Sequence, residues 1–132
     1  MAFDYGTKRV GIAVTDENRI IATGLDTILS HELFPFIRKY LSEQDVDLFV
    51  VGYPRNLDYS RNEMTTTVET FISSLQNHFP KIDVIEIDER FTSKMAQDAI
   101  LQSGAKKKKR QDKALIDKVS ATIILQDYLN RI

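Results

Sequence analysis

Apolar and β-branched residues in the first third of the chain recur with the short period of β-strands. Three such runs, residues 1–4, 9–15 and 20–28, are separated by a tight turn around Gly6 and by the polar sequence 16–19. Gly6 supplies the backbone freedom that a tight turn needs. We therefore expect a meander of three adjacent antiparallel strands.

From residue 30 the apolar period changes to that of a helix, and helical segments alternate with short apolar runs. Apolar residues of segment 30–44 recur at i, i+3, i+4, i+7 and i+8, with Ser30 as the expected N-cap. The continuous runs 48–52 and 83–88 are typical of strands. Helices are expected over 30–44, 62–78, 93–102 and from 112 to the end, the last capped by Asp112.

The order of these elements indicates an α/β fold. Strands separated by helices pair in parallel through right-handed crossovers, so the first strand and the runs 48–52 and 83–88 should share one direction. The expected architecture is a five-stranded mixed sheet, in which two parallel strands join the antiparallel meander, with helices on both faces. A chain of 132 residues suits one domain, residues 1–132.

Composition narrows the range of functions. The net charge is −1, so a nucleic-acid surface would have to be a local patch. The absence of cysteine excludes thiolate zinc sites and thiol catalysis, and the 2 histidines argue against a histidine-rich metal site. No apolar run is long enough to cross a bilayer, and we expect no signal peptide. The first strand is unusually short, as it would be if residues preceded Met1.

Two carboxylates follow strands that should point the same way. Asp4 stands at the end of the first strand and Glu89 directly after the run 83–88, and ligands of open α/β sheets bind at the edge formed by such strand ends. Each residue alone also fits a structural role, Asp4 as a turn-initiating acceptor and Glu89 in an exposed Asp-Glu-Arg turn. Their expected meeting at one edge favours a functional site.

Asp117 is the third candidate acid. It lies in line with Ala121, Ile124 and Tyr128 of the last helix, so it belongs to the inner, apolar face of that helix. A carboxylate that faces a core must be paired, hydrogen-bonded or bound to a metal ion. A salt bridge to Lys113 or another lysine is the structural alternative to metal binding.

Three carboxylates without histidine or cysteine suit a hard cation, Mg²⁺ or Mn²⁺. In phosphodiester cleavage one such ion activates the attacking water and a second stabilises the leaving oxygen. Asp4, Glu89 and Asp117 are therefore the candidate metal ligands and catalytic residues of a metal-dependent phosphodiester hydrolase.

Basic residues flank these acids along the chain. Residues 106–110 form a run of five positive charges, which is typical either of a solvated loop or of a phosphate-binding surface. Its position before Asp117, in a chain of nearly neutral charge, favours phosphate binding. Tyr53 and Tyr59 either stack on bases or pack in the core. The predicted nucleic-acid contacts are Thr7, Lys8, Arg9, Arg55, Asn56, Arg90, Lys106, Lys107, Lys108, Lys109, Arg110 and Lys113.

Four stretches together resemble the YqgF family of bacterial proteins. They span residues 2–13, 50–58, 88–93 and 116–129, and read AFDYGTKRVGIA, VVGYPRNLD, DERFTS and IDKVSATIILQDYL. They follow the family order from end to end of the chain and are specific as a set. Members of this family are described as Holliday junction resolvases and as pre-16S rRNA processing nucleases, with an RNase H-like fold.

The resemblance implies that Asp4, Glu89 and Asp117 form an acidic site with a divalent metal ion, in a cytoplasmic protein that cuts structured nucleic acid. The expected substrate is the 5′ region of precursor 16S rRNA during ribosome biogenesis, with the ribosomal subunit as a further partner. The alternative substrate is a four-way DNA junction, whose two symmetric cuts require a homodimer rather than a monomer. The chain departs from the family in its middle loop, where Arg55 replaces an apolar residue and Tyr59 a glycine.

Two interpretations from other classes compete with a nuclease. The first is a nucleic-acid-binding module without catalysis, against which the retention of all three acids argues. The second is a nucleotide-binding phosphotransferase, because residues 4–7 also resemble the first phosphate loop of the actin, Hsp70 and sugar-kinase superfamily. That architecture needs two such domains around the nucleotide, and we expect only one here.

Overall fold

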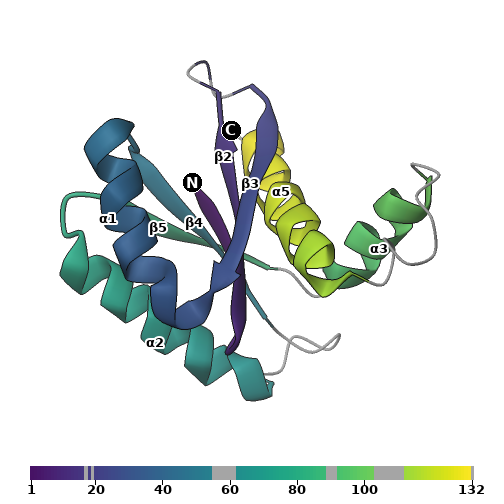
Figure 1. The fold of residues 1–132 in the computed structure, drawn as a ribbon, viewed down its shortest axis with the longest axis horizontal. Coiled ribbons are helices and arrows are strands. Elements are labelled where there is room, and N and C mark those ends of the chain that lie inside the picture. The colour runs from purple at the N-terminus through teal and green to yellow at the C-terminus, as the bar shows by residue number, and fades with distance from the viewer. Residues whose placement is uncertain (17, 19, 55–61, 89–91, 103–111, 132) are drawn as a thin grey trace.

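A computed structural model describes residues 1–16, 18, 20–54, 62–88, 92–102 and 112–131. In these residues a five-stranded sheet has the order β3-β2-β1-β4-β5 (Figure 1). β2 is antiparallel to both β1 and β3, whereas β4 is parallel to both β1 and β5, as predicted. The strands are β1 (Ala2–Tyr5), β2 (Arg9–Thr15), β3 (Ala22–Leu29), β4 (Leu48–Tyr53) and β5 (Asp83–Asp88).

Helices cover both faces of this sheet, so the expected α/β architecture is confirmed. α1 (Leu33–Glu43), which follows the 3-10 turn η1 (Ser30–Glu32), and α2 (Glu63–His78) lie on one face (Figure 1). α5 (Lys113–Arg131) crosses the other face, and α3 (Thr92–Gln102) packs against α5. Among the described helices, none has the length and apolar character needed to span a membrane.

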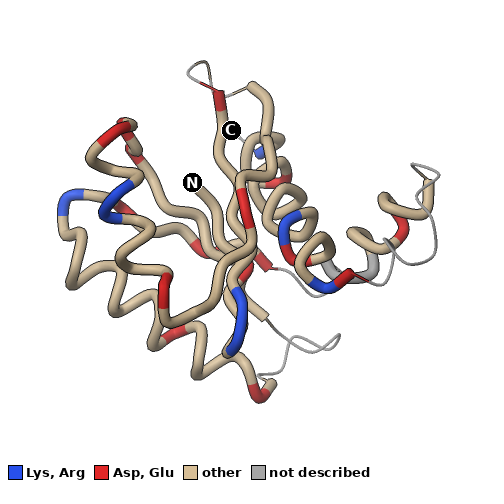
Figure 2. Tube along the Cα trace, in the orientation of Figure 1, with Lys and Arg blue, Asp and Glu red and all other residues tan. Residues whose placement is uncertain are grey.

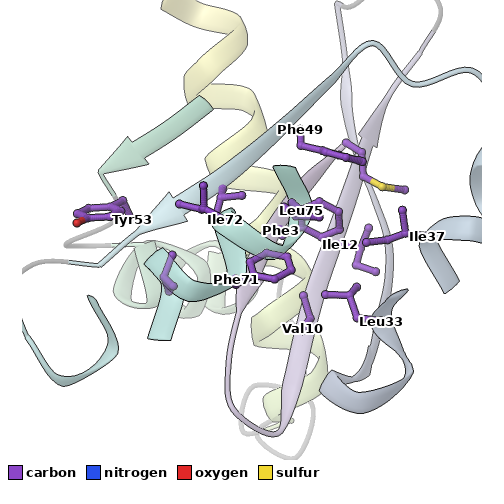
Figure 3. Packing of buried hydrophobic residues seen from close by; sticks show 13 residues of the cluster. Phe3, Val10, Ile12, Leu33, Ile37, Phe49, Tyr53, Phe71, Ile72 and Leu75 are labelled. Atoms are coloured by element: carbon purple, nitrogen blue, oxygen red, sulfur yellow. The ribbon is translucent and has the colours of Figure 1, made fainter. Parts of the chain in front are cut away.

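The sheet face under α1 and α2, called the aromatic face below, holds the larger core. The ring centroid of Phe3 lies 5.5 Å from that of Phe49 and 5.6 Å from that of Phe71 (Figure 3). Tyr5 stacks on Phe71 with the centroids 4.2 Å apart. Apolar residues of both helices enter this core: Leu33, Phe36, Ile37, Tyr40 and Leu41 from α1, and Met64, Val68, Phe71, Ile72 and Leu75 from α2.

The opposite face, called the α5 face below, has a second core built from smaller side chains. Ala2 and Ala13 are fully buried there against Ala121 and Ile124 of α5. Small residues on the strands allow the helix axis to approach the sheet closely, because little side-chain volume separates the two backbones. The sequence prediction that residues 117–128 present an apolar stripe to the core is confirmed.

Side-chain hydrogen bonds explain two differences from the sequence prediction. Ser30 does not cap α1, because its hydroxyl donates a hydrogen bond to the carbonyl of Gly6 at 2.6 Å and a 3-10 turn precedes the helix. β3 begins two residues later than expected. Oδ1 of Asp16 accepts hydrogen bonds from the N–H groups of Ile20 at 2.8 Å and Ile21 at 3.1 Å, which holds both residues in the turn.

Candidate metal and nucleic-acid site

The carboxyl ends of β1, β4 and β5 lie at one edge of the sheet, because these strands are parallel. Asp4 is the penultimate residue of β1, which continues one residue further than predicted, to Tyr5. β5 ends at Asp88, exactly as the sequence indicates, and Glu89 follows it outside the described residues. The predicted edge therefore exists, with Asp4 at it.

The side chain of Asp4 is directed to the α5 face. Neighbouring side chains of a strand alternate between faces, and Ala2 is buried on the α5 face whereas Phe3 is buried on the aromatic face. Asp4 follows Phe3, so it shares the face of Ala2. Its partner across the β1–β2 pairing is Gly11, which is on that face as well.

At Gly11 the backbone of α5 comes close to the backbone of the sheet. A Cβ atom built on Gly11 would overlap the carbonyl oxygen of Asp117, a backbone atom that cannot rotate away. Glycine is therefore required here for close approach. Since Gly11 is the cross-strand partner of Asp4, this contact places the backbone of Asp117 beside that partner, on the face of the sheet to which Asp4 is directed.

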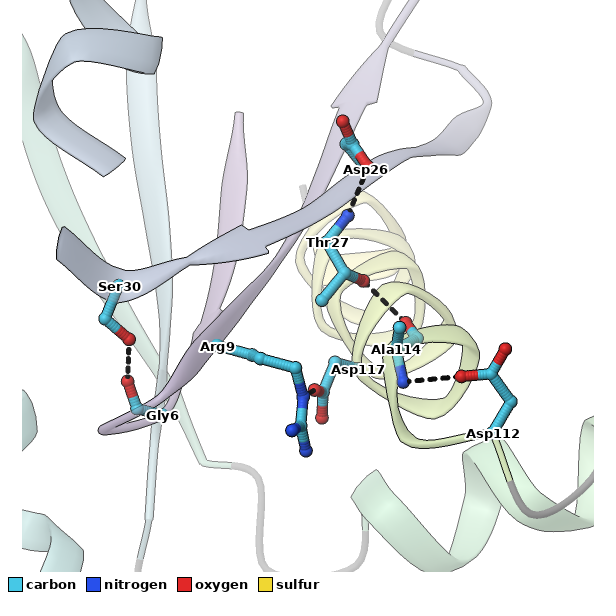
Figure 4. Close-up of polar contacts among 8 residues, drawn as sticks. All are labelled: Gly6, Arg9, Asp26, Thr27, Ser30, Asp112, Ala114 and Asp117. Carbon is cyan, nitrogen blue, oxygen red and sulfur yellow. Dashed lines mark hydrogen bonds and ion pairs between the residues drawn. The ribbon is translucent and has the colours of Figure 1, made fainter. Parts of the chain in front are cut away.

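Asp117 is paired with an arginine. Nε of Arg9 donates to Oδ2 of Asp117 at 3.0 Å, and the two side chains are 34% and 25% exposed (Figure 4). Arg9 begins β2, and its side chain lies on the face of Gly11, two residues further along. The sequence-based alternative for Asp117 was a lysine such as Lys113. The described cation is instead Arg9, 108 positions away, which was predicted only as a phosphate contact.

The donor set of this site fits a hard cation in its chemistry. Asp4 and Asp117 supply carboxylate oxygens, the ligands that Mg²⁺ and Mn²⁺ prefer. Within the described part of the chain, no group of three or more His, Cys, Asp or Glu side chains is arranged to hold a metal ion. The third predicted ligand, Glu89, lies outside that part, so two carboxylates and one arginine make up the described site.

Exposed residues at the same end of the molecule suit phosphate binding. Thr7 and Lys8 are exposed in the β1–β2 turn, and Lys113 is exposed at the start of α5. Figure 2 shows basic stretches at both places. Thr27 of β3 ties the start of α5 to the sheet, because its hydroxyl donates to the carbonyl of Ala114 at 2.5 Å. The other predicted contacts, Arg55, Asn56, Arg90 and Lys106 to Arg110, lie outside the described residues.

Tyr53 packs in the core and does not offer its ring for base stacking. It is the last residue of β4 and only 7% exposed, within the aromatic-face core. Of the two tyrosines considered for stacking, Tyr59 lies outside the described residues.

Comparison with known proteins covers almost the whole chain. The family model described as "RuvX: Holliday junction resolvase" matches residues 1–131. A protein of Flavobacterium psychrophilum is 47% identical over 131 residues, 99% of this chain and 96% of its own length. One of Porphyromonas gingivalis is 50% identical over 130 residues, 98% of this chain and 94% of its own. Both carry the name "Putative pre-16S rRNA nuclease".

Proposed function

Since the chain belongs to the RuvX family, whose fold is RNase H-like, we propose that it is a metal-dependent endonuclease that processes the 5′ end of precursor 16S rRNA. One structural observation carries the proposal: Gly11 lets α5 place Asp117 beside the cross-strand partner of Asp4. The names of the relatives support RNA as the substrate. The reaction would take place in the cytoplasm during ribosome biogenesis, on the rRNA of a ribosomal subunit.

Each acid has a distinct structural support in this proposal. Asp4 is held by a strand paired on both sides, and Asp117 by a helix whose backbone contacts the sheet. Glu89, directly after β5, would be the third ligand and complete the site. A bound Mg²⁺ or Mn²⁺ would supply Lewis acidity and an activated water for phosphodiester hydrolysis. Arg9 offsets part of the negative charge that the carboxylates bring together.

Positive and polar groups around the acids would hold the RNA backbone. Thr7 and Lys8 stand in the turn that directly follows β1, and Lys113 stands four residues before Asp117. Phosphate contacts of this kind fix the position of a nucleic acid without reading its sequence. Arg55, Asn56, Arg90 and Lys106 to Arg110 are proposed to extend the same surface.

The decisive experiment compares two substrates under three metal conditions. Labelled precursor 16S rRNA fragments and a synthetic four-way DNA junction are incubated with Mg²⁺, Mn²⁺ or EDTA. The wild type is run beside the triple variant Asp4→Asn, Glu89→Gln, Asp117→Asn. Asp127→Asn serves as a matched control, because Asp127 is an acid of the same helix whose oxygen lies 2.9 Å from Arg131 at an exposed position.

We expect metal-dependent cleavage of the rRNA fragment by the wild type and by Asp127→Asn, and none by the triple variant. Cleavage of the four-way junction alone would instead favour the activity named in the family description, together with a dimer in solution. Equal cleavage by wild type and triple variant would place the active site elsewhere. Binding without cleavage under every metal would favour a non-catalytic binding module.

A further inference from the structure

The ion pair between Arg9 and Asp117 engages one oxygen of a carboxylate in the proposed metal site. Nε of Arg9 lies 3.0 Å from Oδ2 of Asp117, a charge-assisted hydrogen bond between partly buried groups. An ionised carboxylate has two oxygens with about four lone-pair sites, and this hydrogen bond uses one of the sites on Oδ2. The positive charge of Arg9 at this carboxylate also opposes the binding of a divalent cation there.

The backbones of both residues are fixed, whereas the guanidinium is not. The carbonyl of Arg9 accepts a hydrogen bond from the N–H of Gly6 at 2.9 Å across the hairpin turn. The backbone of Asp117 is packed against Gly11. The long arginine side chain is one-third exposed, so rotation about its χ angles can carry the guanidinium away from Asp117 while both main chains stay in place.

We propose that Arg9 is the counter-cation of the metal site: it pairs with Asp117 while no metal ion is bound and leaves Asp117 on metal binding. The inference rests on the proposed function, because it takes Asp4 and Asp117 as metal ligands. Without a cation, two neighbouring carboxylates repel each other, and Arg9 relieves this repulsion. Once released, its planar guanidinium matches the oxygens of a phosphate in the nucleic-acid backbone.

This makes Arg9 a positioning residue that sets the metal affinity of the site. Because the positive charge opposes a divalent ion and occupies its ligand, neutralising Arg9 should strengthen metal binding in the absence of nucleic acid. A residue that merely held Asp117 in a productive orientation would have the opposite effect, since its loss would weaken metal binding. The sign of the change therefore separates the two roles.

The test measures Mn²⁺ affinity by electron paramagnetic resonance of the free ion, without any nuclease assay. We expect Arg9→Gln to bind Mn²⁺ about three- to tenfold more tightly than wild type. Arg9→Lys, which keeps the charge, should stay close to wild type. Arg131→Gln is the matched control, since Arg131 pairs with Asp127 of the same helix at 2.9 Å on the exposed surface, and it should leave the affinity unchanged.

Unchanged or weaker Mn²⁺ binding by Arg9→Gln would overturn the inference, as would an equal gain in Arg131→Gln. A second measurement uses the wild type alone, so it holds even if Arg9→Gln does not fold. The NMR resonance of the Arg9 Nε–H group, assigned by its loss in Arg9→Lys, should shift on saturation with Mg²⁺. A resonance that does not move would contradict release from Asp117.

Failure of this inference can be told apart from failure of the proposed function. Mn²⁺ binding that Asp117→Asn abolishes but Arg9→Gln leaves unchanged would keep the metal site and reject only the role of Arg9. A wild type that binds no Mn²⁺ would reject the metal site and, with it, the role of Arg9.

Discussion

The two faces of the sheet are built from side chains of very different size. On the aromatic face, rings such as Phe3, Phe49 and Phe71 fill the space under α1 and α2. On the α5 face, the strands present glycine and alanine, including Gly11 and Ala13. Large rings bury much apolar area and therefore stabilise the fold, whereas small residues bring a helix backbone close enough to fix the position of a side chain it carries.

The two faces therefore have different roles: the aromatic face stabilises the fold, and the α5 face positions candidate site residues. Small shifts of α1 or α2 should leave the candidate site in place, because in the described residues the aromatic face carries none of the candidate acids. Shifts of α5 should disturb the site, since the position of Asp117 and its ion pair with Arg9 depend on the contact at Gly11. Substitutions on the first face should lower the free energy of unfolding, and substitutions on the second should change metal binding as well.

The largest effect on stability is expected from Phe3→Ala. Phe3 is fully buried between two other rings, and removing it leaves a cavity that costs about 3–5 kcal/mol of unfolding free energy. Urea denaturation followed by circular dichroism measures this loss. The protein that remains folded should keep wild-type Mn²⁺ affinity. A cost below about 1 kcal/mol would show that the aromatic core is not the main source of stability.

Gly11→Ala should be next in size and should also disturb the site. Its new Cβ meets the backbone of Asp117, so α5 must shift, at a cost of about 2–3 kcal/mol, and Mn²⁺ binding should weaken. Gly24→Ala is the matched control on β3. Its Cβ would lie 2.8 Å from Cγ of Lys118 and 3.1 Å from Oγ1 of Thr122, which are side-chain atoms and not backbone, so the cost should be smaller than for Gly11→Ala. Equal losses of unfolding free energy in the two variants would show that the contact at Gly11 is no more important than that at Gly24.

Removing one helix cap on each face of the sheet allows a comparison in which both variants should lose about the same free energy of unfolding. Asn62 caps α2, since its Oδ1 accepts from the N–H of Met64 at 3.0 Å, and Asp112 caps α5 in the same way through Ala114 at 3.0 Å. Each change to alanine should cost about 1 kcal/mol. Only Asp112→Ala should also weaken Mn²⁺ binding, because α5 carries Asp117. Urea denaturation and Mn²⁺ titration of both variants test this, and similar titration curves would argue against it.

The smallest effect is expected in the β2–β3 turn, which belongs to neither face. Hydrogen bonds from the N–H groups of Ile21 and Ile20 lower the pKa of Asp16. A carboxyl whose pKa is lower in the folded state stabilises the fold above its unfolded pKa, about 3.9, and loses this contribution as pH falls through the folded value. Asp16→Asn should therefore flatten the fall of the melting temperature below about pH 4. A melting temperature that falls as steeply at low pH in Asp16→Asn as in the wild type would contradict this.

Local patterns determined most of the secondary structure. The bounds of β2 and β5 agree residue for residue with the prediction, because period-two runs between turn residues need no tertiary information. The cap of α5 at Asp112 was also predicted, because a capping side chain bonds to an N–H group only two positions further along the chain. Where a distant group took part, prediction failed: the hydroxyl of Ser30 bonds to Gly6, 24 positions away, and is lost as a helix cap.

For the site, the sequence by itself placed Asp4 at the sheet edge, from the direction of β1, and Asp117 on the inner face of its helix, from the apolar stripe. That Glu89 completes the site stays a prediction, because this residue lies outside the described residues. Only the tertiary structure decided that Arg9, and not a lysine near Asp117, pairs with that acid, and that the backbone of α5 comes close to the sheet at Gly11. The physical reason is that hydrophobic periodicity fixes which face of a helix is buried, but not where along the sheet the helix lies. That position depends on the packing of small residues more than 100 positions apart in the chain, such as Ala13 and Ala121.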